Sequence, residues 1–208
     1  LMGLYDRLFY SGFEKIDPSR LGERAAVVGE MIVDAALARN GGRRAGADGV
    51  KTVGLFPGSR AFMVKYLLPY YGKVAERMAA ARPDLEFVVA QSDFMPTAYF
   101  ASLPDVNDGR AIEGVNVRLE QGDDANWLVT EGGVRMRLAR SGEVTAVSDV
   151  VVTAPGTNTA ELGAVGVPMV VVLSGVSSRT RKTSTATVSV GRNARDSDGL
   201  IGPRLPSM

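Results

Sequence analysis

The stretch KTVGLFPGSR, residues 51–60, decides the fold of this chain. A short apolar run at 52–56 breaks at a Pro-Gly-Ser-Arg turn at 57–60, as a buried strand does where it ends in a tight turn. Behind the turn, apolar residues recur every three or four positions over 67–81, which predicts an amphipathic helix. Pro69 lies inside this period and predicts a kink or a new first turn there.

Further apolar segments continue this alternation of strand and helix. Strands are predicted at 85–90, 115–119, 149–153 and 169–173, a glycine-turn hairpin at 126–130 and 134–138, and short helices at 96–102, 141–148 and 157–165. Apolar strands that are separated by helices indicate a parallel sheet covered on both faces. We therefore predict a Rossmann-like α/β domain with a parallel sheet over residues 51–173.

The segments on either side of this domain have a different character. Residues 1–50 are interpreted as a lead-in and linker, with a short buried strand at 25–28, the start of a helix at 32–37 and a glycine-rich stretch at 39–50. Residues 174–208 contain eleven Ser or Thr, six basic and two acidic residues, and no aliphatic period. This composition predicts an irregular tail, which is disordered or loosely packed, or else results from truncation or a shifted reading frame.

Composition excludes several classes of function. The chain has 208 residues, enough for one to two domains, and a formal net charge of +1, which gives no support to a nucleic-acid binder. It contains neither Cys nor His, so disulfides, thiolate nucleophiles, Cys- or His-ligated metals and a histidine base are all excluded. No signal-peptide pattern is present over residues 1–12 and no apolar run is long enough to span a membrane. We expect a cytoplasmic chain.

Two predicted strand-to-helix turns have the chemistry to bind an anion. In the first, Gly58 lets the backbone approach a phosphate, Ser59 offers a hydroxyl and an amide, and Arg60 offers a charged fork. The following helix would point its free N–H groups at the same place. The alternative is a plain helix cap, with Ser59 capping and Arg60 solvated.

The second turn follows the most apolar strand of the chain. Gly156, Thr157, Asn158 and Thr159 supply small or polar groups at a helix N-terminus, and Glu161 follows one turn later, where a carboxylate can accept both hydroxyls of a ribose. The alternative is a capping box, formed by Asn158 with Glu161 three residues later, that satisfies the amides of the helix, and the two interpretations can coexist. Neither turn is a Gly-x-Gly-x-x-Gly fingerprint or a nucleoside-triphosphate loop, so dinucleotide and triphosphate enzymes are disfavoured.

Several blocks together resemble one family. They are LFPGSR at 55–60, VK at 64–65, LLP at 67–69, RPDLEFV at 82–88, PGTNTAELGA at 155–164 and GVPM at 166–169. In this order they resemble bacterial lipid-A-disaccharide synthases, and most closely the divergent synthase-like proteins of photosynthetic bacteria. The segment VGEMIVD at 28–34 is similar to the interdomain VGHPLVD stretch of that family, with Glu30 where the family pattern has His.

The resemblance implies one half of a two-Rossmann-domain (GT-B type) glycosyltransferase of lipid A biosynthesis, namely the half that holds a UDP-sugar. It implies that Gly58, Ser59 and Arg60 meet the diphosphate, and that Glu161 holds the uridine ribose. The donor site would also be lined by Gly156, Thr157, Asn158 and Thr159. The family reaction transfers an acyl-glucosamine from UDP to an acyl-glucosamine phosphate, with no metal or cofactor.

The resemblance assigns the acceptor-activating residue to an N-terminal half that this chain lacks, so no catalytic residue is predicted here. A lipid or sugar-lipid acceptor, and peripheral contact with the inner membrane face, would also involve that half. Two alternatives remain open: a non-catalytic module that binds a nucleotide sugar, and a UDP-sugar epimerase-like domain. We expect the chain alone to be incomplete and inactive.

Overall fold

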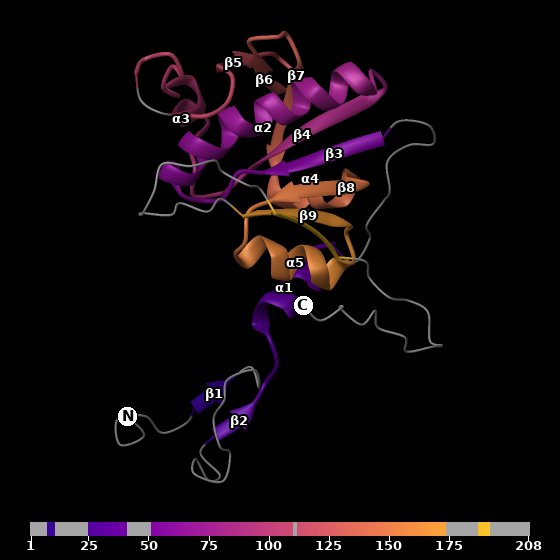
Figure 1. Cartoon of the computed structure of the whole chain (residues 1–208). Helices are drawn as coiled ribbons and strands as arrows, with labels where there is room; N and C mark the ends of the chain where they lie inside the picture. The colour runs from indigo at the N-terminus through magenta and orange to yellow at the C-terminus, as the bar shows by residue number, and fades with distance from the viewer. Residues whose placement is uncertain (1–7, 11–24, 41–50, 110–111, 174–186, 192–208) are drawn as a thin grey trace, which may run out of the picture.

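The structure is a computed structural model, and it describes residues 8–10, 25–40, 51–109, 112–173 and 187–191. Its main body is an eight-stranded sheet with helices on both faces (Figure 1). From edge to edge the strands are β10 (Thr187–Gly191), β9 (Met169–Leu173), β8 (Val150–Thr153), β3 (Lys51–Phe56), β4 (Leu85–Gln91), β7 (Arg135–Arg140), β6 (Asn126–Thr130) and β5 (Val117–Gln121).

The five central strands are parallel, and their order is that of a Rossmann fold. Along the chain β3, β4 and β7 are added in one direction, after which β8 and β9 are added on the other side of β3. Numbered in chain order, the parallel strands run 3-2-1-4-5 across the sheet, as in dinucleotide-binding domains. The predicted Rossmann-like α/β fold is confirmed. Strands β5, β6 and β10 extend it with antiparallel pairs.

Two apolar layers hold the helices on the sheet. On one face α2 (Ala61–Ala81) and α3 (Thr97–Ala101) cover a core around Leu55, Leu68 and Tyr71. On the other face α4 (Ser141–Val147) and α5 (Thr157–Val165) cover a second core around Phe56 and Val151. Because successive strand residues point to opposite faces, β3 and β8 contribute to both cores, which explains why these strands are apolar throughout.

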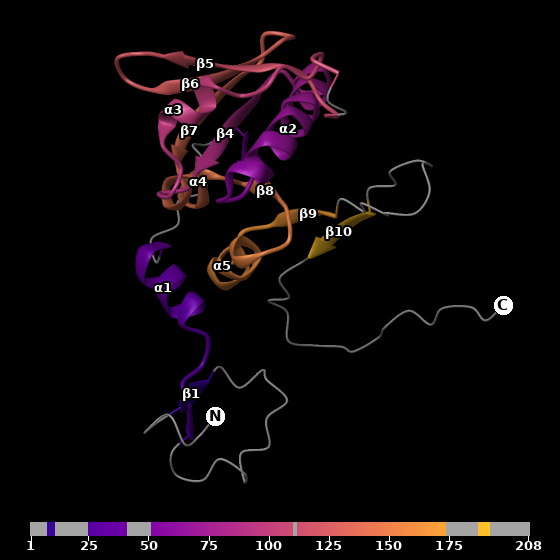
Figure 2. The same cartoon turned by 90° about the vertical axis from the view of Figure 1, so that its left-hand side faces the viewer.

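Helix α1 (Met31–Asn40) packs against α5 and α4 outside the second core (Figure 2). It follows a separate sheet of two parallel strands, β1 (Leu8–Tyr10) and β2 (Ala25–Val27). The strand predicted at 25–28 therefore exists, but the expectation that it is buried is wrong, since Val27 is 60% exposed. Its only strand partner in the described part of the chain is β1, too small a sheet to cover it.

Pro69 does not interrupt α2, which continues through it as one helix of 21 residues, so the predicted new first turn is absent. A following loop packs on this point instead. The N–H of Val115 donates to the Pro69 carbonyl oxygen at 3.1 Å, and a Cβ atom on Gly114 would lie 2.3 Å from the Pro69 carbonyl carbon. Because Val115 is used in this way, β5 begins at Val117, two residues later than predicted.

Strand β10 lies in the segment for which an irregular tail is predicted, and it pairs antiparallel with β9. The irregular interpretation therefore does not hold for Thr187–Gly191. The rest of 174–208 and most of the predicted linker, 41–50, lie outside the described residues. Among the helices that are described, none is both long and apolar enough to cross a membrane.

Candidate functional site

The two predicted anion-binding turns leave the sheet side by side. Strands β3 and β8 are parallel neighbours, and their last residues, Phe56 and Thr153, are partners in the register. The turn at 57–60 follows the first and the turn at 154–156 follows the second. Between β3 and β8 the strand order reverses, and in open α/β sheets ligands bind outside the carboxyl ends of the strands at such a point.

The first turn has the backbone that close approach to a ligand requires. Gly58 has φ +98°, in the left-handed region that strains other residues, and a Cβ there would lie 3.0 Å from Sδ of Met63. Pro57 is buried below it, whereas Ser59 and Arg60 are exposed. Hence the polar groups of this turn face solvent while the apolar residue anchors it.

The structure does not contain the plain helix cap by Ser59 that was the alternative for the first turn. The N-cap of α2 is Arg60 rather than Ser59, in an extended conformation and with no side-chain hydrogen bond to the helix. The first N–H groups of an α-helix lack i−4 partners, and here the N-cap side chain does not bond to them, although the Met63 N–H bonds to the Arg60 carbonyl oxygen at 2.9 Å. The start of α2 is thus open to an anionic group.

The second turn is equally open. Its N-cap is Gly156, with φ +154°, no side-chain cap hydrogen bond, and no atom within 4 Å of the position that a Cβ would take. The predicted capping box is therefore wrong, because Asn158 lies inside α5 rather than at its cap. Thr157 is exposed, and Asn158 and Glu161 are half-buried.

Thr159 differs from its neighbours in this turn. Its hydroxyl donates to the carbonyl oxygen of Gly156 at 2.6 Å, so its proton is committed to the helix. Toward a ligand the Thr159 hydroxyl can therefore act only as a hydrogen-bond acceptor, through its oxygen lone pairs.

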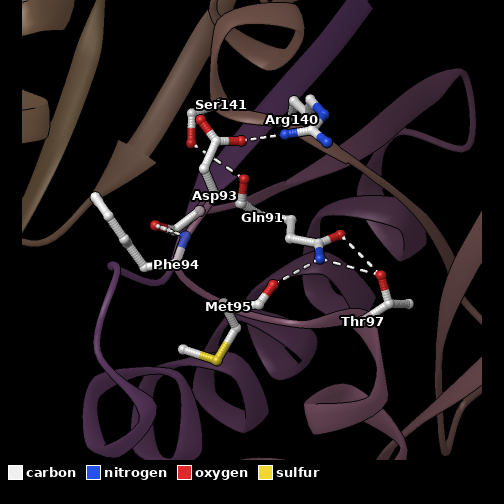
Figure 3. A network of polar contacts seen from close by, with 8 residues as sticks. Gln91, Asp93, Phe94, Met95, Thr97, Arg140 and Ser141 are labelled. Carbon is white, nitrogen blue, oxygen red and sulfur yellow. Dashed lines mark hydrogen bonds and ion pairs between the residues drawn. The ribbon is translucent and has the colours of Figure 1, made fainter.

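A polar network fixes the neighbouring loops at the same edge (Figure 3). Gln91, the last residue of β4, donates through its side-chain amide to the Met95 carbonyl at 2.7 Å. Arg140, at the end of β7, forms an ion pair with Asp93, and the Ser141 hydroxyl donates to the Gln91 carbonyl at 3.4 Å. The sequence analysis did not identify these four residues, Gln91, Asp93, Arg140 and Ser141. The one sequence feature that could have indicated them is their position shortly after predicted strands.

In the described part of the chain no three His, Cys, Asp or Glu residues gather where they could hold a metal ion. Glycines, small polar residues, two helix N-termini and one exposed arginine remain at the switch point. This chemistry suits a phosphate or diphosphate bound through backbone N–H groups and a guanidinium.

Comparison with known proteins agrees with the motifs, although no family model matches the chain. It is 32% identical over 122 residues to a lipid-A-disaccharide synthase from Nitrosococcus oceani, which covers 59% of this chain. The chain is 37% identical over 122 residues, 58% of its length, to the lipid-A-disaccharide synthase from Anaeromyxobacter sp. strain K. It is 31% identical over 145 residues, 69% of its length, to that from Geobacter sulfurreducens.

The chain is similar to lipid-A-disaccharide synthases. The resemblance predicted from the sequence blocks is thereby confirmed. The matched part corresponds to 26% of the Nitrosococcus and Anaeromyxobacter synthases and 29% of the Geobacter synthase, so the chain spans less than a third of these relatives.

Proposed function

We propose that this chain is the donor-binding part of a UDP-sugar-dependent hexosyltransferase of the lipid-A-disaccharide synthase type. Residues 51–173 form the donor domain, one half of a two-domain GT-B enzyme, and residues 1–50 lead into it. The observation that carries the proposal is the pairing of Phe56 with Thr153, which sets two uncapped glycine turns next to each other at the switch point.

Each turn has a separate task in this proposal. Gly58 and Ser59 bring backbone N–H groups to the diphosphate, and Arg60 neutralises its charge. On the other side Gly156, Thr157, Asn158 and Thr159 line the donor pocket. Glu161, one turn into α5, accepts hydrogen bonds from the ribose hydroxyls.

The chemical step needs groups that this chain does not supply. In the transfer, the acceptor hydroxyl attacks the anomeric carbon, the bond to the UDP oxygen breaks, and a base takes the hydroxyl proton. We assign that base to the N-terminal half of the enzyme, together with the sugar-lipid acceptor and contact with the inner membrane face. The donor half works on the cytoplasmic side, and its contribution is to orient the donor and stabilise the departing diphosphate.

A non-catalytic module that binds a nucleotide sugar is the second candidate. It would use the same two uncapped glycine turns to hold the ligand without a chemical step. Both candidates require the same donor site and differ in whether sugar is turned over when a family N-terminal half is supplied. An epimerase-like domain is less favoured, because the whole chain lacks His.

Calorimetric titration of the chain with UDP, UDP-N-acetylglucosamine and NAD tests the donor site. We expect binding of the two uridine compounds and weak or no binding of NAD, because the turns suit one ribose and one diphosphate. Binding of NAD without binding of UDP would overturn the proposal.

A further inference from the structure

Strand β5 forms one edge of the main sheet, away from the candidate donor site. In the described part of the chain β6 is the only strand beside it, and β6, β7 and β4 lie between it and β3. Figure 2 shows β5 on the far side of the sheet from β9 and α5. An unpaired edge presents a row of N–H and C=O groups with which another strand can pair. This edge is therefore a candidate interaction surface that donor binding does not use.

The pairing of β5 with β6 decides which backbone groups stay free. Just before the paired residues, the N–H of Glu131 donates to the Asn116 carbonyl oxygen at 2.8 Å. Just after them, the N–H of Gly122 donates to the Ala125 carbonyl oxygen at 3.1 Å. Both bonds continue the register of the ladder, in which hydrogen-bonded pairs alternate with pairs that are not bonded. The even-numbered residues of β5 therefore direct their backbone groups to β6.

The odd-numbered residues, Val117, Leu119 and Gln121, have their N–H and C=O groups at the open edge. Among the described residues no other segment forms a backbone hydrogen bond with these groups. The side chains of Val117 and Leu119 pack against the first core and are only partly buried. A strand laid against this edge would thus meet unused hydrogen-bonding groups together with apolar surface that continues the core.

Two opposite charges lie on the other face of β5. The side chains of Arg118 and Glu120 are 65% and 38% exposed, and Nη2 of Arg118 lies 2.8 Å from Oε1 of Glu120. On β7, Nη2 of Arg135 lies 3.8 Å from Oε2 of the same carboxylate. Each of the two edge charges is accessible enough to take a further partner of opposite sign.

These charges select how a second copy of the strand would pair. Antiparallel pairing of the odd-numbered groups over most of the strand can be centred on residue 118, 119 or 120. A centre on Arg118 or on Glu120 places that residue opposite its own copy, and like charges that lie opposite each other destabilise a sheet. A centre on Leu119 places each Arg118 opposite the partner's Glu120, in the non-hydrogen-bonded pairs whose side chains lie closest. The strand is self-complementary in this register.

We propose that two copies of this chain associate edge to edge through β5, antiparallel and centred on Leu119, so that their sheets become continuous. The interface is two-fold symmetric, as in most homodimers. Each Arg118 pairs with the partner's Glu120, and the two Leu119 side chains meet beside the first core. The inference goes beyond the proposed function and does not depend on it, and both candidate donor sites stay open because β3 and β8 lie away from this edge.

Sedimentation equilibrium of the 208-residue chain tests the proposal, and we expect a monomer–dimer equilibrium. Arg118→Glu and Glu120→Arg should each weaken the dimer about tenfold, because both cross-strand ion pairs become repulsive. The double variant Arg118→Glu/Glu120→Arg should dimerise like the wild type, since opposite charges face each other again. An equimolar mixture of the two single variants should form a heterodimer for the same reason.

A matched control and a backbone variant sharpen the test. Arg82→Glu should leave the dimer unchanged, because Arg82 and Asp84 form a similar exposed ion pair two positions apart, between α2 and β4. Gln121→Pro should weaken the dimer, because it removes an N–H from the open edge. Urea unfolding of this variant should stay close to that of the wild type, since the lost N–H does not face β6.

Three outcomes would overturn the proposal. One is a chain that stays monomeric up to its highest soluble concentration. Another is a dimer of equal affinity in the wild type and both single variants, which would place the interface elsewhere. The third is weakening in the single variants without recovery in the double variant, which would exclude the antiparallel register. Because none of these measurements uses UDP, failure of the interface is distinguishable from failure of the donor site.

Discussion

Phe56 and Thr153 end two neighbouring parallel strands and lie opposite each other in their register. They are 97 positions apart in the chain, yet the turns that follow them leave the sheet together. Both side chains are buried, Phe56 in the second core, and this burial fixes where the two glycine turns begin. The candidate donor site is therefore positioned by the register of the sheet, and the following predictions test what that position does.

Arg60→Ala should weaken UDP about ten- to hundredfold, the loss expected for one charge-assisted phosphate contact of about 1.5–3 kcal/mol. Titration calorimetry measures the effect. Arg77→Ala is the matched control, an exposed arginine more than four turns further along the same helix. Equal affinities in the two variants would remove Arg60 from the site.

Gly156→Ala should lower both the stability of the fold and the affinity for UDP. At φ +154° an alanine is strained by about 1–3 kcal/mol, and its methyl group would occupy the open space that a ligand needs. Gly133→Ala is the control, since Gly133 has φ +85° and open space around a Cβ but lies in the turn between β6 and β7. Urea unfolding should show a loss in both variants, and calorimetry a loss of affinity in Gly156→Ala alone.

Glu161→Ala should remove the preference for ribose over deoxyribose. The wild type is expected to bind UDP about tenfold more tightly than 2′-deoxy-UDP, because a hydrogen bond to a carboxylate is worth about 1.5–3 kcal/mol. In the variant the two ligands should bind alike, while Glu131→Ala, in the exposed turn after β6, should keep the preference. A preference that survives in Glu161→Ala would assign the ribose contact elsewhere.

Tyr71→Phe should leave the protein as stable as the wild type or stabilise it by about 1 kcal/mol. The Tyr71 hydroxyl is fully buried and has no hydrogen-bond partner among the described residues, so its removal relieves a desolvated group. Tyr71→Ala should instead cost about 3–5 kcal/mol through the cavity it leaves. Urea unfolding at neutral pH measures both, and a large loss in Tyr71→Phe would mean that the hydroxyl is bonded in solution.

The same residue predicts a pH dependence. Burial raises the pKa of the Tyr71 phenol well above its usual value near 10, so the folded state keeps this proton where the unfolded state releases it. The unfolded state then binds fewer protons, and stability falls as the pH rises above about 10. The free energy of unfolding should therefore fall more steeply above about pH 10 in the wild type than in Tyr71→Phe.

The chain alone should not transfer sugar, even where it binds UDP. Transfer needs the acceptor hydroxyl in near-attack geometry and a base for its proton, and both are assigned to the other half of the enzyme. A radiolabelled UDP-sugar assay with acyl-glucosamine phosphate measures this. Turnover above a control without protein would refute the expectation and place a base within this chain.

Much of the fold follows from local sequence. The apolar run at 52–56, the period over 67–81 and the glycine hairpin near 132–133 each specify an element by burial pattern or turn geometry, and the structure has those elements. Local patterns did not predict that α2 continues through Pro69. At this point a loop more than 40 positions later packs on the helix. Nor did local patterns reveal β10, whose pairing with β9 is a contact between segments.

The sequence by itself determined which residues are suited to bind a diphosphate, because glycine at a left-handed position, small polar side chains and one arginine are local properties. The roles of Gly58, Arg60, Glu161 and their neighbours stay predictions, as does the domain division. The tertiary structure decided that the two turns adjoin and that neither helix start is capped by the side chain of its N-cap residue. The physical reason is that strand order, register and burial arise from contacts between distant segments, which no local pattern encodes.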